Sequence, residues 1–303
     1  MRNAMVVFAF VVAAVPVIGQ SWTPPRTPWG DPDLQGFWPS SEMLGVPFER
    51  PANLGEKATL TDEEFARLPP KPRTTNANDA FFGESRDHWR EYGKPQRQTS
   101  LIVDPPDGRL PPMTADGAKR AAALPNEARR GTLNGPENAS TAARCLSRGA
   151  LGSMLPIGNS SGNQIIQAPG LVVIRNEMIQ ETRIVPVDGR PHVGARVRSI
   201  MGDSRGRWEG LTLVVDTVNF NENSGGNRPF SRDARLSERF TRTDRNTIRY
   251  EATIDDPRTW TRPWTIAFPL KQDPHYYLFE FACHEGNYFS MISMLGGARL
   301  SEK

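Results

Sequence analysis

The sequence predicts a mainly β fold, an antiparallel β-barrel that follows a proline-rich N-terminal arm with short helices. Three observations support this prediction. Most of the 27 prolines lie between residues 21 and 140. Beyond residue 163, about nine β-rich runs follow one another at intervals of roughly 8–12 residues. Several of these runs alternate apolar and polar residues, which is the pattern of a strand with one buried face.

The first twenty residues are typical of a secretory signal peptide. Arg2 supplies a positive charge, residues 6–15 form an apolar run, and residues 17–19 suit cleavage near residue 19 or 20. A membrane anchor is the alternative, but the run is short and Pro16 interrupts it. We therefore expect residues 1–20 to be removed and the mature protein to be periplasmic or secreted, without stable membrane insertion.

Residues 21–140 are expected to form an arm that wraps the rest of the protein. Proline restricts regular structure, yet Thr61 and Thr114 are suited to cap short helices, and residues 85–92 form a third candidate. Disorder is the alternative, but disordered segments are poor in aromatic residues. The expected aromatic anchors of the arm are Trp22, Trp29, Phe37, Trp38, Phe81, Phe82 and Trp89.

Residues 141–303 are expected to form the β-domain. Glycine, asparagine and aspartate turns separate its runs, among them the turn expected at residues 202–206. The expected strands cover residues 164–168, 171–177, 182–187, 197–201, 211–220, 236–243, 246–254, 264–270 and 276–284.

Two of these strands show which side chains should share a face. In one strand, Ile248, Tyr250, Ala252 and Ile254 alternate with polar residues, and in the next Trp264, Ile266, Phe268 and Leu270 fall together. A lipocalin-like up-and-down barrel would close such a set of strands without leaving edges. A sandwich of two sheets is the competing arrangement.

Charge and cysteine content limit the functional classes. The net charge is +3, from 37 basic and 34 acidic residues, and no dense basic run is present, so a nucleic-acid partner is not expected. Cys145 and Cys283 are the two cysteines. In an exported protein an even count favours a disulfide over a pair of buried thiols.

No motif dictates a reaction. Two matches to the G-x-S-x-G pattern centre on Ser160 and Ser204, but neither has the strand before it and the helix after it that a nucleophile elbow requires. We expect acid/base chemistry instead, with His284 as the general acid/base, because a carboxylate can orient an imidazole for proton transfer. The candidate catalytic residues are His284, Glu285, Glu280, His192 and Asp203.

A barrel with a ligand inside would turn some strand charges and aromatic rings inward. Trp208 is expected to plug one end of the barrel. No cofactor is favoured, although His192, His284 and a carboxylate would suit a divalent metal such as zinc. The candidate ligand-binding residues are Arg183, Glu177, Trp208, Glu209, Tyr250, Trp264 and Tyr288.

Four segments together resemble a known family. They are residues 27–36 (TPWGDPDLQG), 202–210 (GDSRGRWEG), 212–217 (TLVVDT) and 283–288 (CHEGNY). The chain resembles a large family of uncharacterised exported proteins of environmental Gram-negative bacteria. The resemblance implies a periplasmic or secreted location and says little about activity. Leu211 departs from the acidic residue expected before the TLVVDT segment, so no essential carboxylate is assigned there.

These observations lead to one expectation with two alternatives. The favoured function is an exported enzyme, a lyase, isomerase or hydrolase, that acts on a small plant-derived, aromatic or terpenoid compound. A non-catalytic, lipocalin-like protein that binds a small-molecule ligand is the first alternative. A structural envelope protein is the second.

Overall fold

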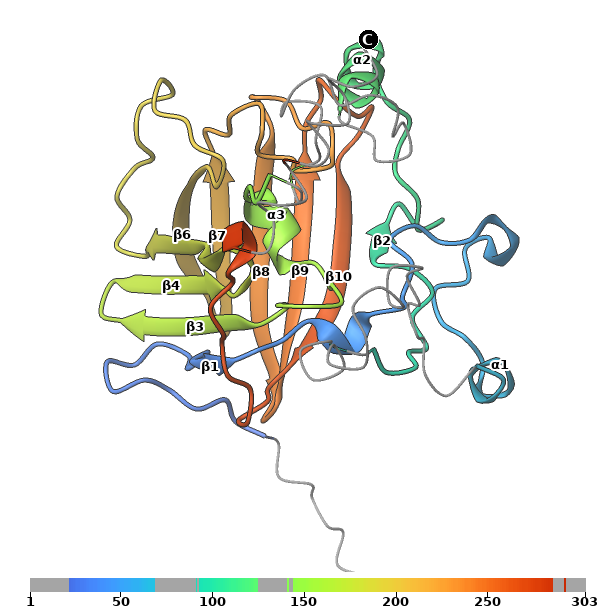
Figure 1. Ribbon diagram of the computed structural model, residues 1–303. Helices are drawn as coiled ribbons and strands as arrows, with labels where there is room; N and C mark the ends of the chain where they lie inside the picture. Colours follow the sequence, from blue (N-terminus) through green and yellow to red (C-terminus); the bar gives the residue numbers. More distant parts are fainter. Residues whose placement is uncertain are drawn as a thin grey trace, which may run out of the picture.

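The computed structural model describes residues 22–68, 91, 93–124, 141, 144–285 and 292 (Figure 1). The expected signal peptide, the expected helix at residues 85–92 apart from Glu91, and Tyr288 therefore lie outside the described residues. None of the helices in the described part of the chain has the length and apolar character needed to cross a membrane.

The described strands form two antiparallel sheets. One has four strands in the order β1-β3-β4-β5, and the other has six in the order β2-β10-β9-β8-β7-β6. The strands β5 and β6 are neighbours in space but belong to different sheets. The mainly β, antiparallel prediction is confirmed, and no closed ring of strands is found among the described residues. The strands are β1 (Gly36–Phe37), β2 (Ile102–Asp104), β3 (Asn163–Ala168), β4 (Leu171–Asn176), β5 (Thr182–Pro186), β6 (Asp203–Glu209), β7 (Thr212–Val218), β8 (Arg235–Asp244), β9 (Thr247–Asp255) and β10 (Trp264–Lys271).

The N-terminal stretch contributes an edge strand to each sheet. Strand β1 pairs with β3, and β2 pairs with β10. Trp38, which follows β1, is fully buried, whereas Trp29 is exposed. Both expected helix caps are confirmed. Thr61 forms a capping box at the start of α1 (Asp62–Ala66), and the Thr114 hydroxyl accepts a hydrogen bond at the start of α2 (Ala115–Ala123).

The expected turn at residues 202–206 is wrong, because strand β6 begins at Asp203 and runs through Gly206. Gly206 lies inside this strand, and a Cβ there would come within 2.6 Å of Val187 Cγ1 and 3.0 Å of Val185 Cγ1. The glycine thus lets the side chains at the end of β5 approach β6 closely, a role that glycine also has within strands. The expected strand at residues 197–201 is likewise absent, and only Ser199 forms a bridge there, with Phe220.

The last expected strand, residues 276–284, is also wrong. This segment is irregular and ends in a short helical turn at residues 283–285. Its apolar alternation is real, yet two of its aromatic side chains, Tyr277 and Phe279, are each 70% exposed. Side-chain and covalent bonds hold the segment, since the N–H of Phe279 points to a Glu177 carboxyl oxygen and Cys283 is in a disulfide.

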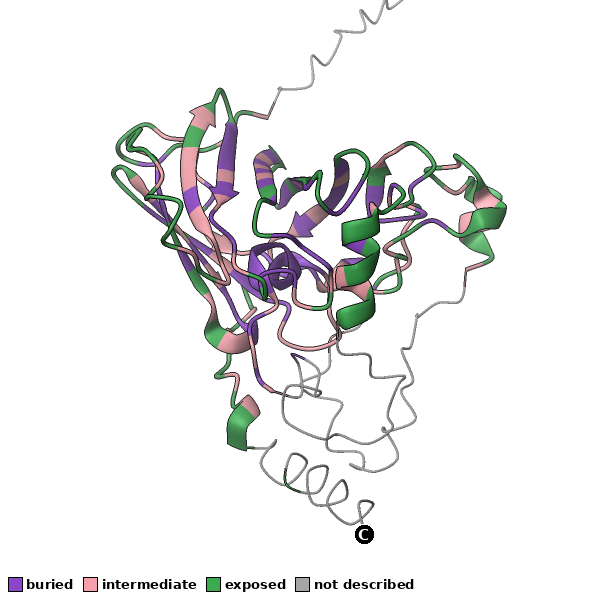
Figure 2. Ribbon diagram, turned by 90° about the horizontal axis from the view of Figure 1, so that it is seen from above, coloured by how far each residue is buried: buried purple, intermediate pink, exposed green. Residues whose placement is uncertain are grey.

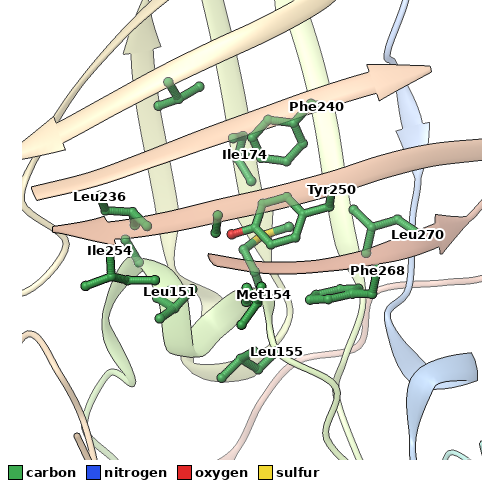
Figure 3. Close-up of a cluster of buried hydrophobic side chains, with 14 of the residues drawn as sticks. Leu151, Met154, Leu155, Ile174, Leu236, Phe240, Tyr250, Ile254, Phe268 and Leu270 are labelled. Atoms are coloured by element: carbon green, nitrogen blue, oxygen red, sulfur yellow. The ribbon is translucent and has the colours of Figure 1, made fainter. Parts of the chain in front are cut away.

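A short internal helix, α3 (Gly149–Met154), occupies the space between the sheets. All six of its residues are buried, and the strands curve around it (Figure 2). Leu151, Met154 and Leu155 point toward side chains of both sheets in Figure 3. The predicted faces of β9 and β10 are confirmed, because their expected apolar residues are all buried in this core. The sequence patterns gave no indication of α3.

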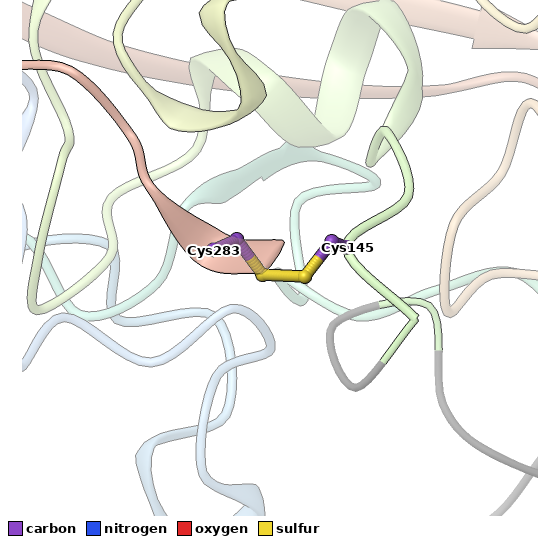
Figure 4. The surroundings of a disulfide bond; sticks show 2 residues. All are labelled: Cys145 and Cys283. Carbon is purple, nitrogen blue, oxygen red and sulfur yellow. A yellow bond between two sulfur atoms is a disulfide. The ribbon is translucent and has the colours of Figure 1, made fainter. Parts of the chain in front are cut away.

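The predicted disulfide between Cys145 and Cys283 is confirmed (Figure 4). Their Cα atoms are 5.8 Å apart, and the bond joins positions 138 residues apart. It ties the C-terminal segment to the chain just before α3.

Candidate functional site

Two of the predicted catalytic residues meet at the start of β6. His192 Nδ1 lies 2.7 Å from Asp203 Oδ2, which also accepts the N–H of Val193 at 3.0 Å. Arg205 donates to the other Asp203 oxygen at 2.7 Å. Partial burial opposes ionisation of Asp203, but the hydrogen bonds from His192, Val193 and Arg205 outweigh it and lower the pKa of Asp203. This pair lies at the surface, with a partly exposed imidazole.

The other predicted catalytic residues lie on the C-terminal segment. Glu280, His284 and Glu285 are all exposed, and the expected strand at residues 276–284, on which Glu280 and His284 would have lain on one face, does not form. The residues that the structure describes contain no group of three or more histidine, cysteine or acidic side chains placed to hold a metal ion. His192 and His284 are thus not assembled with a carboxylate into the metal site that their residue types would permit.

Two of the predicted ligand-binding residues, Arg183 and Tyr250, bind a buried glutamate. Arg183 Nη2 donates to Glu238 Oε1 at 2.9 Å and Arg183 Nη1 donates to Glu238 Oε2, while the Tyr250 hydroxyl donates to Oε1 at 2.8 Å. Burial and the Glu238 charge raise the pKa of Tyr250. Burial opposes the charge of Arg183, but the attraction of Glu238 outweighs it and raises the arginine pKa. The trio links β5 of one sheet to β8 and β9 of the other.

The remaining predicted ligand-binding residues have separate surroundings. Trp264 is fully buried in the core and stacks edge-on against Phe48. Trp208 is half-buried against the core, and Glu209 is exposed and accepts hydrogen bonds from Arg207 and Arg239. Glu177 is the exception, because it belongs to a second polar group described next.

Glu177 and Glu91 lie on either side of one tyrosine hydroxyl. Tyr276 Oη is 2.6 Å from Glu177 Oε2 and 2.7 Å from Glu91 Oε1. Ser161 donates its N–H to Glu91 Oε1 at 2.9 Å and its hydroxyl to Glu91 Oε2. These four side chains, which we call the Glu91–Glu177 group, come from four separate parts of the chain. Glu177 follows β4, Ser161 precedes β3, and Tyr276 begins the C-terminal segment.

The two short contacts of the Tyr276 hydroxyl are both satisfied when the Glu91–Glu177 group carries an additional proton. A phenol has one hydrogen and can donate it to only one of two carboxylates. With both glutamates ionised, the second short contact would therefore oppose two oxygen lone pairs. A proton on Glu177 removes this conflict, since Glu177 then donates to Tyr276 and Tyr276 donates to Glu91. Glu91 in turn accepts the two hydrogen bonds from Ser161.

The environment of Glu177 favours its protonated form. Burial raises the pKa of the Glu177 carboxyl above its usual value, and the negative charge of Glu91 adds to the effect, against the lowering by its hydrogen bonds. Burial and both carboxylates raise the pKa of the Tyr276 phenol, so this residue stays neutral. The group thus places two carboxyl groups on either side of a neutral phenol.

The backbone around Glu177 adopts unusual conformations. Ile179 and Gln180 have φ angles of 58° and 54°, and Ser160 has a φ of 54°. Left-handed backbone is costly for a β-branched residue such as isoleucine. At Gly162, a Cβ would come within 2.7 Å of Glu177 Oε2 and 2.6 Å of Leu278 Cδ2, so only glycine leaves room for the group. Such concentrated strain is common at functional sites.

Neither G-x-S-x-G serine is placed as a nucleophile. Ser160 lies in the loop before β3, and Ser204 is buried within β6, where its hydroxyl is 2.8 Å from that of Thr217. Ser161, which follows the central serine of the first match, is the serine that contacts a carboxylate. Sequence reasoning identified Glu177 alone of the Glu91–Glu177 group, because its members are distant in sequence and match no motif.

Comparisons with protein-family models, with curated proteins and with solved structures each gave no match. The fold and the site therefore define the class of this protein by themselves. It is a β-rich, disulfide-linked protein in which two carboxyl groups lie on either side of one tyrosine hydroxyl.

Proposed function

We propose that this protein is an exported enzyme that acts on a small organic compound by acid/base chemistry at the Glu91–Glu177 group. The observation that carries the proposal is the single phenol hydroxyl within 2.7 Å of two carboxyl oxygens. Protonated Glu177 is the general acid and Glu91 is the general base. A disulfide and a signal-like N-terminus support export, since disulfides persist in oxidising compartments.

Tyr276 connects the two carboxyl groups as a proton relay. When Glu177 gives its proton to a substrate oxygen, the Tyr276 hydroxyl can pass its own proton to Glu177 and receive one held by Glu91. A proton removed from carbon or water by Glu91 thereby regenerates the acid without release to solvent. Lyase, isomerase and hydrolase reactions all need one proton donated and one removed, and a positioned acid/base pair typically contributes about 10²–10⁴-fold to the rate.

The lipocalin-like alternative places a ligand between the sheets. Side chains of α3 and of Leu155, the residue after it, fill the centre of that space, and Leu151, Met154 and Leu155 all belong to the buried core. We therefore propose that the chemistry takes place near the loops that carry the Glu91–Glu177 group.

The surface pair of His192 and Asp203 is the second candidate for a proton donor and acceptor, favoured by its 2.7 Å contact.

The test is turnover of a defined panel by the mature protein and three variants. The panel contains esters, epoxides and β-hydroxy carbonyl compounds on phenyl and monoterpene skeletons, with products followed by mass spectrometry. We expect wild-type turnover of one class, and a loss of at least about 10²-fold in Glu177→Gln and Tyr276→Phe. His192→Ala is the matched variant and should retain the activity.

Two outcomes would contradict the proposal. If His192→Ala abolishes turnover and Glu177→Gln does not, the catalytic pair is His192 and Asp203. If no compound turns over and Glu177→Gln only changes thermal stability, the Glu91–Glu177 group anchors the C-terminal segment, as a binding or structural envelope protein would require.

A further inference from the structure

Two arginines without acidic partners lie together at the beginning of α3. Arg148 immediately precedes the helix, and Arg228 ends a tight loop that packs against it. A Cβ on Gly226 would be 3.0 Å from the Arg148 carbonyl oxygen, so the loop and the start of α3 are in direct backbone contact. This contact holds both arginines in one region of the molecule.

The guanidinium of Arg228 rests on an aromatic ring. Its central carbon is 4.2 Å from the centroid of the Phe48 ring, and Phe48 packs edge-on against Trp264 at 5.8 Å. Stacking on a ring face stabilises the positive charge but uses none of the five N–H donors. The donors at the edge of the guanidinium therefore remain for another group.

Neither guanidinium has an acceptor among the described residues. Other arginines of this chain have one, as Arg183 has with Glu238 and Arg205 with Asp203. Charged groups that are withdrawn from water are normally paired. Burial, and to a lesser extent the nearby charge of Arg148, lowers the pKa of Arg228 to about 10.

The two side chains can still be reached from outside. Both residues are only partly buried. Among the described residues, some side-chain nitrogen atoms are completely buried without a hydrogen-bond partner, and those of Arg148 and Arg228 do not belong to this set. Two partly buried, like-charged groups with free donors are therefore open to an external partner of opposite charge.

We propose that Arg148 and Arg228 form a binding site for a small oxyanion, a carboxylate, phosphate or sulfate group. Guanidinium groups bind such anions through two parallel N–H···O bonds, and two arginines provide donors for three or more oxygens. The bound anion supplies the missing negative charge. This site lies at the opposite end of α3 from the Glu91–Glu177 group, because Asn176, the neighbour of Glu177, contacts Met154 at the last residue of the helix.

The test measures thermal unfolding of the mature protein with added sodium phosphate, sulfate or benzoate, each against sodium chloride at equal ionic strength. We expect at least one oxyanion to raise the melting temperature of the wild type by several degrees. Arg148→Gln and Arg228→Gln should lose this shift. Arg249→Gln is the matched control, because it removes an equal charge from the exposed face of β9 and should keep the shift.

The anion that gives the largest shift identifies the group, since the three salts present phosphoryl, sulfonyl and carboxyl oxygens. Titration calorimetry with that anion should give a dissociation constant at least tenfold weaker in both variants. Arg228→Lys keeps the charge without the planar fork and should bind with intermediate strength. Equal shifts in all proteins, no shift in the wild type, or loss of the shift in Arg249→Gln would each overturn the proposal. None of these results depends on turnover at Glu177.

Discussion

Replacing Arg183 by methionine leaves Glu238 in the core with a charge that only one hydroxyl contacts. The substitution removes two charge-assisted hydrogen bonds from a carboxylate whose side chain is 0% exposed. Removing one partner of a buried ion pair typically costs about 3–5 kcal/mol. We therefore expect Arg183→Met to lower the free energy of unfolding by about 3–5 kcal/mol. Tyr250→Phe removes one hydrogen bond to the same carboxylate and should cost about 1.5–3 kcal/mol.

The assay is unfolding in guanidinium chloride, followed by tryptophan fluorescence and extrapolated linearly to water. The double variant Arg183→Met/Glu238→Leu is the critical comparison, because it removes both charges. It should be more stable than Arg183→Met alone, since apolar replacements of a whole buried pair are often tolerated. A loss below about 1 kcal/mol in Arg183→Met, or a double variant less stable than either single variant, would refute the assignment of this trio as a buried link between the sheets.

Three further predictions concern the disulfide, Glu177 and Gly206. Reduction of the Cys145–Cys283 bond should lower stability by on the order of 5 kcal/mol in the chain-entropy model, because the bond closes a loop of 138 residues; a melting temperature unchanged by reductant would contradict this. The raised pKa of Glu177 stabilises the folded state fully below the ordinary glutamate pKa of about 4.3, and this stabilisation is lost as pH rises through the folded-state value. The stability of Glu177→Gln relative to the wild type should therefore increase as the pH rises above about 4, and a difference in melting temperature that does not change with pH would count against this prediction. Gly206→Ala should lower the free energy of unfolding by about 1–3 kcal/mol, because the new methyl group would clash with Val187. An unchanged denaturation midpoint would contradict this, since it would mean that β5 and β6 move apart at no cost.

Local sequence patterns predicted the elements whose causes are local. Alternation along β9 and β10 predicted which side chains are buried, and the caps at Thr61 and Thr114 predicted two helix starts. Each depends on residues within a few positions of one another. The even cysteine count predicted the disulfide because the expected compartment is oxidising.

The rest depends on contacts between distant residues. Helix α3 is only six residues long and includes two glycines, so its own propensity is weak and burial between the sheets stabilises it. From the sequence alone, Gly206 looks like part of a turn. Its actual role, which is to leave room for Val185 and Val187 beside β6, is evident only from the structure. The segment that begins at Tyr276 alternates like a strand, yet the Glu91–Glu177 group and the disulfide determine its path. Glu91 and Tyr276 are 185 residues apart, and no pattern along the chain joins them.

The pairing of β2 with β10 affects how the protein must fold. Strands β6 to β10 pair with their neighbours in sequence and can form as successive hairpins, whereas Thr265 of β10 pairs with Asp104, which lies about half the length of the chain away. The partner strand β2 is synthesised early but has nothing to pair with until β10, the last strand, has emerged. Without β2, one edge of β10 presents unpaired N–H and C=O groups, which are a template for association with another chain. Protection of this edge during folding therefore depends on the N-terminal stretch that carries β2, and truncation of this stretch should lead first to aggregation.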